Sequence, residues 1–152
     1  MQLSFTQLKI FVFSSLLLLA VFATVAQAEE DLTPVKHDFL VTSVTKDKAH
    51  PYYDQGHEIG FAVNGVSGAS LTLERGKTYT FGIDTGVQHD FYLSTKSLGW
   101  GTATLTQGVK GNYTYKGTVT FTPTADTPDV VYYSCRNHKY MGGEIHIVDG
   151  KK

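Results

Sequence analysis

The recurrence of short β-prone runs separated by turn residues is the feature that most constrains this chain. Apolar and polar residues alternate clearly in 118–122, whereas no stretch after residue 28 shows sustained helical periodicity. Asn64-Gly65 and Arg75-Gly76 supply turns between runs, and the glycine-rich, polar segment 97–116 is expected to be an irregular loop or a weak edge strand. The pattern predicts an all-β fold, a Greek-key β-sandwich of about eight strands. The expected strands are 37–44, 58–64, 69–73, 78–83, 89–94, 117–122, 130–135 and 144–148.

Residues 1–28 have the features of a secretory signal peptide. Lys9 is the only charged residue before Glu29, an almost unbroken apolar run covers 10–25, and Ala26-Gln27-Ala28 is a small-x-small cleavage signature. A retained transmembrane helix is the weaker interpretation, because such a helix usually needs about 20 apolar residues. We therefore predict a single domain at 29–152 that is periplasmic or secreted and has no stable membrane insertion after cleavage.

The charge balance of the predicted domain is close to neutral. Without Lys9, the 13 Lys and Arg residues become 12 against 14 Asp and Glu, a net charge of −2 with the histidines neutral. This balance gives no indication of binding to nucleic acid or to an anionic membrane surface. A chain of this length can bury one core, and we expect it to act as a monomer.

The chain has one cysteine, Cys135, which cannot form an internal disulfide. A solitary thiol in an oxidising compartment is a liability unless it is buried and inert or bound to a metal. The neighbours favour a metal, because Cys135, His138 and Met141 follow one another as Cys-x2-His-x2-Met. Thiolate, imidazole and thioether form a soft ligand set that suits copper better than zinc, calcium or magnesium.

A further imidazole would have to come from another strand, and His89 is the best candidate. It opens the expected strand 89–94 and shares a face with Phe91 and Leu93, so it points inward at one end of the sheet. A buried structural histidine would give the same pattern, and the ligand loop at 135–141 is what favours a metal ligand. The remaining histidines are at positions 37, 50, 57 and 146, and we expect His37 and His146 to be structural or surface residues.

These motifs resemble those of the cupredoxins, the family of small mononuclear blue-copper proteins. The matching features are Tyr133-x-Cys135 at a strand end, the Cys135-x2-His138-x2-Met141 loop with the short spacing of amicyanin, and His89 placed 46 residues before the cysteine. The resemblance implies that His89, Cys135 and His138 are equatorial ligands of one copper ion and that Met141 is a distant axial ligand. Cupredoxins commonly have Asn after the first histidine, and this chain has Asp90 there.

The resemblance further implies a protein that transfers single electrons between redox partners and is not an enzyme. Copper enzymes of this type need a histidine beside the cysteine, and here Ser134 and Arg136 flank it. Arg136, Lys139 and Tyr140 surround the exposed side of the ligand loop, where a redox partner protein could dock.

Other interpretations stay open. Zinc could replace copper, although methionine is a poor zinc ligand. A copper carrier or scavenger is the main functional alternative, and a β-domain used for adhesion or matrix assembly is a third. The segment 48–57, with His50, His57 and two tyrosines, could form a second metal site or a docking loop, or be an ordinary polar loop.

Overall fold

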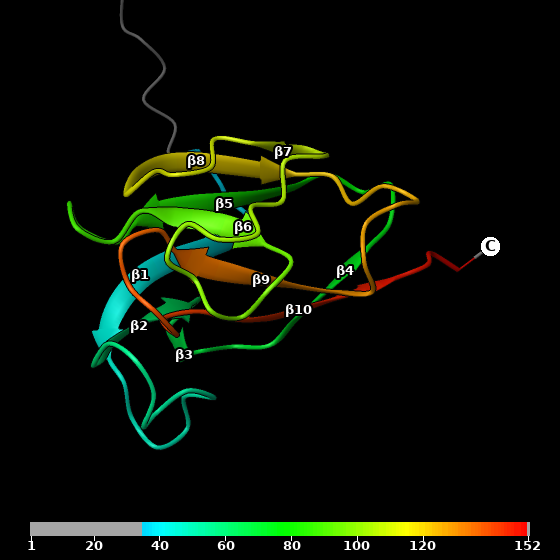
Figure 1. Ribbon diagram of the computed structural model, residues 1–152. Coiled ribbons are helices and arrows are strands. Elements are labelled where there is room, and N and C mark those ends of the chain that lie inside the picture. Colours follow the sequence, from blue (N-terminus) through cyan, green and yellow to red (C-terminus); the bar gives the residue numbers. More distant parts are fainter. Residues whose placement is uncertain (1–34, 152) are drawn as a thin grey trace, which may run out of the picture. The chain divides into compact units, whose positions relative to one another are not determined.

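The computed structural model describes residues 35–151, and within them the chain forms ten strands and no helix (Figure 1). The strands are β1 (Phe39–Thr45), β2 (Ile59–Val63), β3 (Val66–Ser67), β4 (Leu71–Glu74), β5 (Tyr79–Asp84), β6 (Phe91–Ser94), β7 (Val109–Lys110), β8 (Lys116–Phe121), β9 (Val130–Cys135) and β10 (Gly143–Val148). A helix that could cross a membrane is therefore not found in this range. The predicted signal peptide lies outside the described residues, and its boundary stays a prediction.

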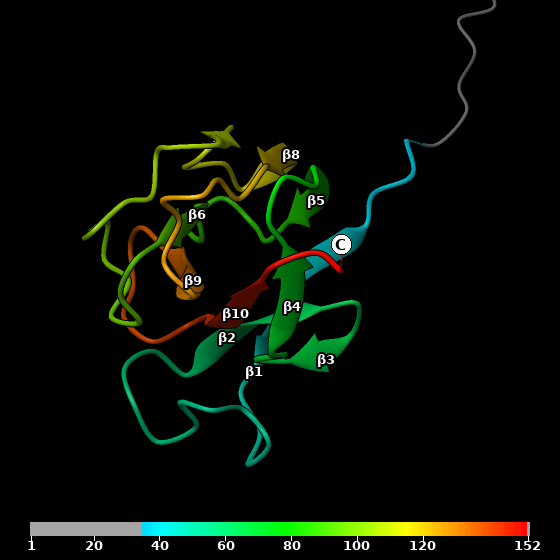
Figure 2. The ribbon, with the colours of Figure 1, turned by 90° about the vertical axis from the view of Figure 1, so that its right-hand side faces the viewer.

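The strands form two mixed sheets that pack face to face (Figure 2). One sheet has the order β3-β2-β1-β5-β8-β7 and the other β4-β10-β9-β6. The β1–β5 and β4–β10 pairs are parallel and all other strand pairs are antiparallel. The chain crosses repeatedly between the sheets, which confirms the predicted all-β Greek-key sandwich.

Alternate residues of the strands fill the space between the sheets. In β9, Val131, Tyr133 and Cys135 are fully buried on the core face, as the period of two in a strand requires. Phe81 of β5 and Phe91 of β6 pack against each other across the two sheets, with ring centroids 5.7 Å apart. Cys135 therefore ends its strand inside the core rather than at the surface.

Each of the eight expected strands is present, with ends within two residues of the prediction. The strand β3, which is two residues long, was not predicted. The equally short β7 is an edge strand inside the segment 97–116, where a weak edge strand was one of the two expectations. One expectation was wrong in detail, because His89 does not open β6. Its amide donates to the Gly86 carbonyl at 3.0 Å, so the preceding turn continues through residue 89 and the strand begins at Phe91.

Gly142 should be intolerant of any side chain. A Cβ built there would lie 1.6 Å from the Tyr133 carbonyl oxygen, which belongs to the paired backbone of β9 and cannot move aside. We expect Gly142→Ala to lower the free energy of unfolding of the metal-free protein by about 3 kcal/mol in urea denaturation. Gly150→Ala is the control, because its Cβ would meet only Glu74 Oε2 at 3.6 Å. Equal stability of the two variants would contradict the close approach.

Candidate metal centre

Three of the four predicted ligands meet at one end of the sandwich. His89 comes from the turn before β6, Cys135 ends β9, and His138 lies in the loop between β9 and β10. One nitrogen of each imidazole and the Cys135 Sγ all lie within 4.8 Å of one another. Within residues 35–151 no other group of three or more His, Cys, Asp or Glu side chains has this geometry.

Strand pairing explains why His89 reaches Cys135. The β6–β9 register sets Phe91 opposite Cys135, so the residues just before β6 lie beside the residues just after β9. The Arg136 amide donates to the Asp90 carbonyl at 2.8 Å and extends this pairing by one step. The Asn137 side-chain amide donates to the Gln88 carbonyl at 2.9 Å. The turn that carries His89 and the loop that carries His138 are thus tied to each other directly.

The separation of the donor atoms fits a single metal ion. Cys135 Sγ and His138 Nδ1 are 3.7 Å apart. Metal bonds to imidazole nitrogen and thiolate sulfur of about 2.0–2.3 Å hold such donors at about this separation from each other. His89 Nδ1 is buried and has no hydrogen-bond partner among the described residues. A buried ring nitrogen is rarely left unpaired, and a metal bond would satisfy it.

Burial sets the protonation of the three donors. Burial lowers the pKa of His89, and the neighbouring His138 and His57 lower it further. Burial and His57 likewise lower the pKa of His138. Both imidazoles therefore favour the neutral form, which has a free lone pair. Burial raises the pKa of the Cys135 thiol, an effect opposed by the amides of Asn137 and His138, so the thiol loses its proton most readily to a soft metal ion.

Met141 is buried, with 1% of its surface exposed, and it ends the same loop. Its carbonyl accepts hydrogen bonds from the Phe61 amide at 2.6 Å and from His50 Nε2 at 3.2 Å. The backbone at residue 141 is thereby held by two hydrogen bonds. Its role as the axial ligand stays a prediction.

His57 also lies beside the site, a position that was not predicted from the sequence. Its ring centroid lies 4.1 Å from that of His138 and 5.5 Å from that of His89. His57 Nδ1 accepts the Ile59 amide at 3.0 Å, so the neutral ring carries its proton on Nε2. The His57 ring therefore lies against the rings of both histidines of the cluster. The unusual composition of 48–57 was the only sequence signal for it.

The other histidines lie apart from the cluster. His37 pairs with Thr118 at 2.8 Å, and His146 lies 3.5 Å from Glu144 at the surface. His50 is buried under the ligand loop, and the structure does not bring it together with His57 as a second three-ligand group within residues 35–151.

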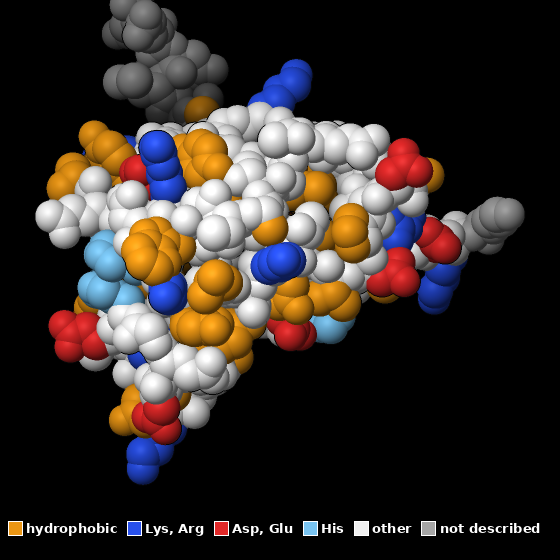
Figure 3. Space-filling view, viewed as in Figure 1, with side chains coloured by type: hydrophobic (Ala, Val, Ile, Leu, Met, Phe, Trp, Pro, Cys, Tyr) orange, Lys and Arg blue, Asp and Glu red, His pale blue; other side chains and the backbone are white. Residues whose placement is uncertain are grey.

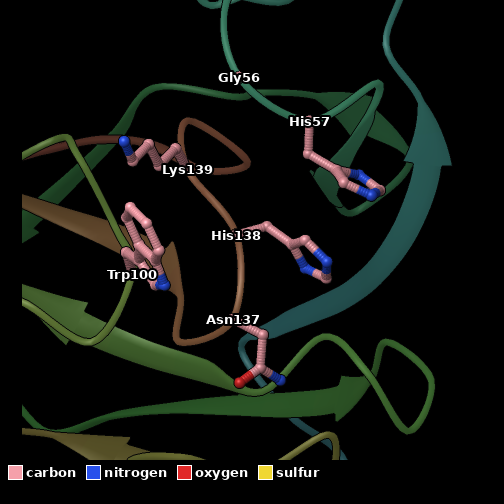
Figure 4. A pocket seen from close by; sticks show the side chains of 6 residues that line it. All are labelled: Gly56, His57, Trp100, Asn137, His138 and Lys139. Carbon is pink, nitrogen blue, oxygen red and sulfur yellow. The ribbon is translucent and has the colours of Figure 1, made fainter.

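A shallow cavity of about 300 Å³ opens beside His138 (Figure 4). It is lined by Gly56, His57, Trp100, Asn137, His138 and Lys139. Trp100 is 58% exposed, and Lys139 Nζ lies 4.3 Å from the centre of its ring. In Figure 3, histidine side chains gather at one edge of the molecule, next to hydrophobic, basic and acidic ones. One edge of the site is thus open to solvent, while the Cys135 sulfur is enclosed.

Residues 35–149 match the At5g54830-like domain, and the chain belongs to that family. Among curated proteins, Protein Skeletor isoforms B/C and D/E of Drosophila melanogaster are each 48% identical to it over 33 residues. That match covers 22% of this chain but only 4% and 2% of those relatives.

Solved structures of rusticyanin are also similar to this chain. Rusticyanin from Thiobacillus ferrooxidans has a TM-score of 0.41 and 17% identity over 72% of this chain and 76% of its own. Reduced rusticyanin has a TM-score of 0.39 and 16% identity over 72% and 78%. Independently of these scores, the two-sheet topology and the His89–Cys135–His138 cluster agree with the resemblance to cupredoxins.

The enclosure of Cys135 predicts low thiol reactivity. Its side chain is fully buried and its pKa is raised by that burial, so little thiolate is accessible in the metal-free protein. We expect slow reaction with a disulfide reagent such as Ellman's reagent under native conditions at pH 8, and rapid reaction in denaturant. A native rate equal to the denatured rate would contradict the buried position.

Proposed function

We propose that this protein binds one copper ion through His89, Cys135, His138 and Met141 and transfers single electrons between redox partners. The observation that carries the proposal is the convergence of His89 with Cys135 and His138 across 46 residues of sequence. One thiolate and two imidazoles with a distant thioether are the donors of blue-copper electron-transfer sites. A bound copper ion would supply the one-electron chemistry, and the residues supply its geometry and surroundings.

The backbone around the site supports a role that needs little rearrangement between oxidation states. The ligand loop is tied to a second loop, because the Trp100 amide donates to the Cys135 carbonyl at 2.8 Å and the Tyr140 amide to the Leu98 carbonyl at 3.1 Å. Donors held by strand ends and by several backbone hydrogen bonds keep one arrangement. A rigid site with this donor set suits electron transfer rather than catalytic turnover.

The open edge at His138 is where we propose that electrons enter and leave. Trp100 and Lys139 beside it offer an apolar and a basic contact for a redox partner protein, in an interface of modest size. Export to the periplasm or to the cell exterior completes the proposal, and the predicted signal peptide at 1–28 supports it.

A copper carrier or scavenger remains the second candidate. Handing over an ion favours exposed donors that exchange readily, whereas Cys135 is fully buried and Met141 is 1% exposed. This enclosure favours an ion that is retained. Reversible reduction without loss of copper would support electron transfer, and rapid release of Cu(I) to a chelator would support delivery.

Copper loading tests the ligand set. Adding Cu(II) to the metal-free protein should produce an intense visible band from sulfur-to-copper charge transfer, with a matching EPR signal, because Cys135 is the only thiolate donor. Cys135→Ser should lose the band. His146→Ala is the control and should keep it, since His146 lies at the surface beside Glu144. A band that persists in the serine variant would refute the assignment.

The axial role of Met141 has its own test. Met141→Leu should keep the intense band, because the thiolate and both imidazoles remain. Its reduction potential should rise, because loss of the weak thioether donor removes electron density that stabilises Cu(II) more than Cu(I). Cyclic voltammetry of the copper-loaded wild type and variant measures the shift. An unchanged potential would mean that Met141 is only a core residue.

A further inference from the structure

The segment 46–57, called the clasp here, contacts four consecutive residues of the ligand loop, 138–141. The His57 ring lies against His138, and the His57 amide donates to the Lys139 carbonyl at 3.2 Å. Lys46 Nζ donates to the Tyr140 carbonyl at 3.1 Å. His50 Nε2 bonds to the Met141 carbonyl at 3.2 Å. The clasp and the loop are more than 80 residues apart in sequence, yet every residue of this stretch of the loop is held.

Lys46 organises the clasp from within. It is only 6% exposed, and its ammonium donates to the carbonyls of Tyr52 at 2.8 Å, Gln55 at 2.5 Å and Tyr140 at 3.1 Å. All of its N–H groups have acceptors, as expected for the charged form, and none of these acceptors is a carboxylate. Two of the bonds close the clasp on itself, and the third joins it to the ligand loop. A buried cation without a neighbouring anion is costly and calls for an explanation.

His50 contacts the next residue of the ligand loop, Met141. Its Nδ1 accepts the Tyr52 amide at 3.1 Å, so the neutral ring has its proton on Nε2 and donates it to the Met141 carbonyl. The Phe61 amide donates to the same oxygen at 2.6 Å. Two donors on one carbonyl fix the backbone of Met141 from the side of the clasp.

Three glycines allow this close contact. A Cβ at Gly60 would lie 2.6 Å from His50 Nε2, and one at Gly68 would lie 2.3 Å from Pro51 Cδ. Gly56, with φ of +65°, approaches the ligand loop itself, where a Cβ would be 2.4 Å from the Lys139 carbonyl oxygen. Figure 4 shows Gly56 and His57 beside His138 and Lys139 at this contact. Side chains of the clasp thus pack against the backbone at Gly60 and Gly68, and the clasp's own backbone at Gly56 packs against the ligand loop.

We propose that Lys46 is a positioning residue that holds the clasp and the ligand loop in the metal-binding arrangement before any metal is bound, and that its buried charge favours the reduced metal. The first half concerns the metal-free protein alone. The second half rests on the proposed function, because a positive charge in a poorly screened interior stabilises the less positive metal state.

Amide hydrogen exchange of the metal-free protein tests the positioning role. In Lys46→Met, which keeps the length and loses the donors, the amides of His57 and Phe61 should exchange roughly 10- to 100-fold faster than in wild type, the effect expected from lost bonds to a charged donor. Lys48→Met is the matched control, because Lys48 lies in the same segment and is exposed. The Ile147 amide, which donates to Asp129 at the other end of β10, is the internal reference and should keep its rate.

Two results would overturn the positioning role. One is unchanged exchange at His57 and Phe61; the other is equal acceleration at Ile147, which would mean that Lys46 only stabilises the whole domain. If Lys46→Met does not fold, amide exchange of the metal-free wild type tests whether the loop is held in advance. Its His57 and Phe61 amides should be protected to an extent comparable with Ile147, and near-complete exchange within the dead time would show that the loop is not held in advance.

The potential of the copper-loaded protein tests the electrostatic half. We expect a lower reduction potential for Lys46→Met than for wild type, an unchanged potential for Lys48→Met, and release of copper to a chelator that is roughly 10- to 100-fold faster for Lys46→Met. Equal reduction potentials in all three proteins would overturn the inference that the Lys46 charge favours the reduced metal. If wild type forms no copper–thiolate band, the proposed function fails, and the exchange experiment on the metal-free protein still decides the positioning role.

Discussion

The site depends on one antiparallel pairing, that of β6 with β9. Its register sets Phe91 opposite Cys135, so the turn before one strand and the loop after the other must emerge side by side. A shift by one residue would turn Cys135 out of the core and carry its sulfur away from His89. The register is itself fixed by the packing of Phe91 and Tyr133, whose rings stack with centroids 6.2 Å apart. The position of the donors is therefore set by the hydrophobic core.

A second constraint is that buried polar groups need partners. The ligand loop leaves carbonyls that no strand can pair, and it lies between two other segments that supply donors. The loop at 98–100 pairs with it from one side, and the clasp binds it from the other. This explains why the segment 48–57, which has the composition of an ordinary polar loop, contains the buried His50 and a His57 ring that lies against His138. Its residues donate hydrogen bonds to backbone carbonyls of the ligand loop.

The sequence was sufficient for the features that follow a simple period or spacing. Alternation located the eight main strands, and the spacing of Cys135 and His138 predicted two donors that the structure does bring together, whereas the ligand role of Met141 stays a prediction. His89 was selected correctly for the cluster although it precedes its strand, because the strand begins only two residues later and His89 stays at the same end of the sheet. The contacts of Lys46, His50 and His57 were not predictable. These contacts depend on how an irregular loop packs against glycines such as Gly60, and such packing leaves no periodic pattern in the sequence.

The order of the chain has a consequence for biosynthesis. Cys135 and His138 lie near the C-terminal end of the described domain, and β9 gains its second neighbour only when β10 pairs with it. A ribosome must therefore complete nearly the whole domain before the donors can assemble. The cluster of His89, Cys135 and His138 therefore forms late, once β10 has paired with β9.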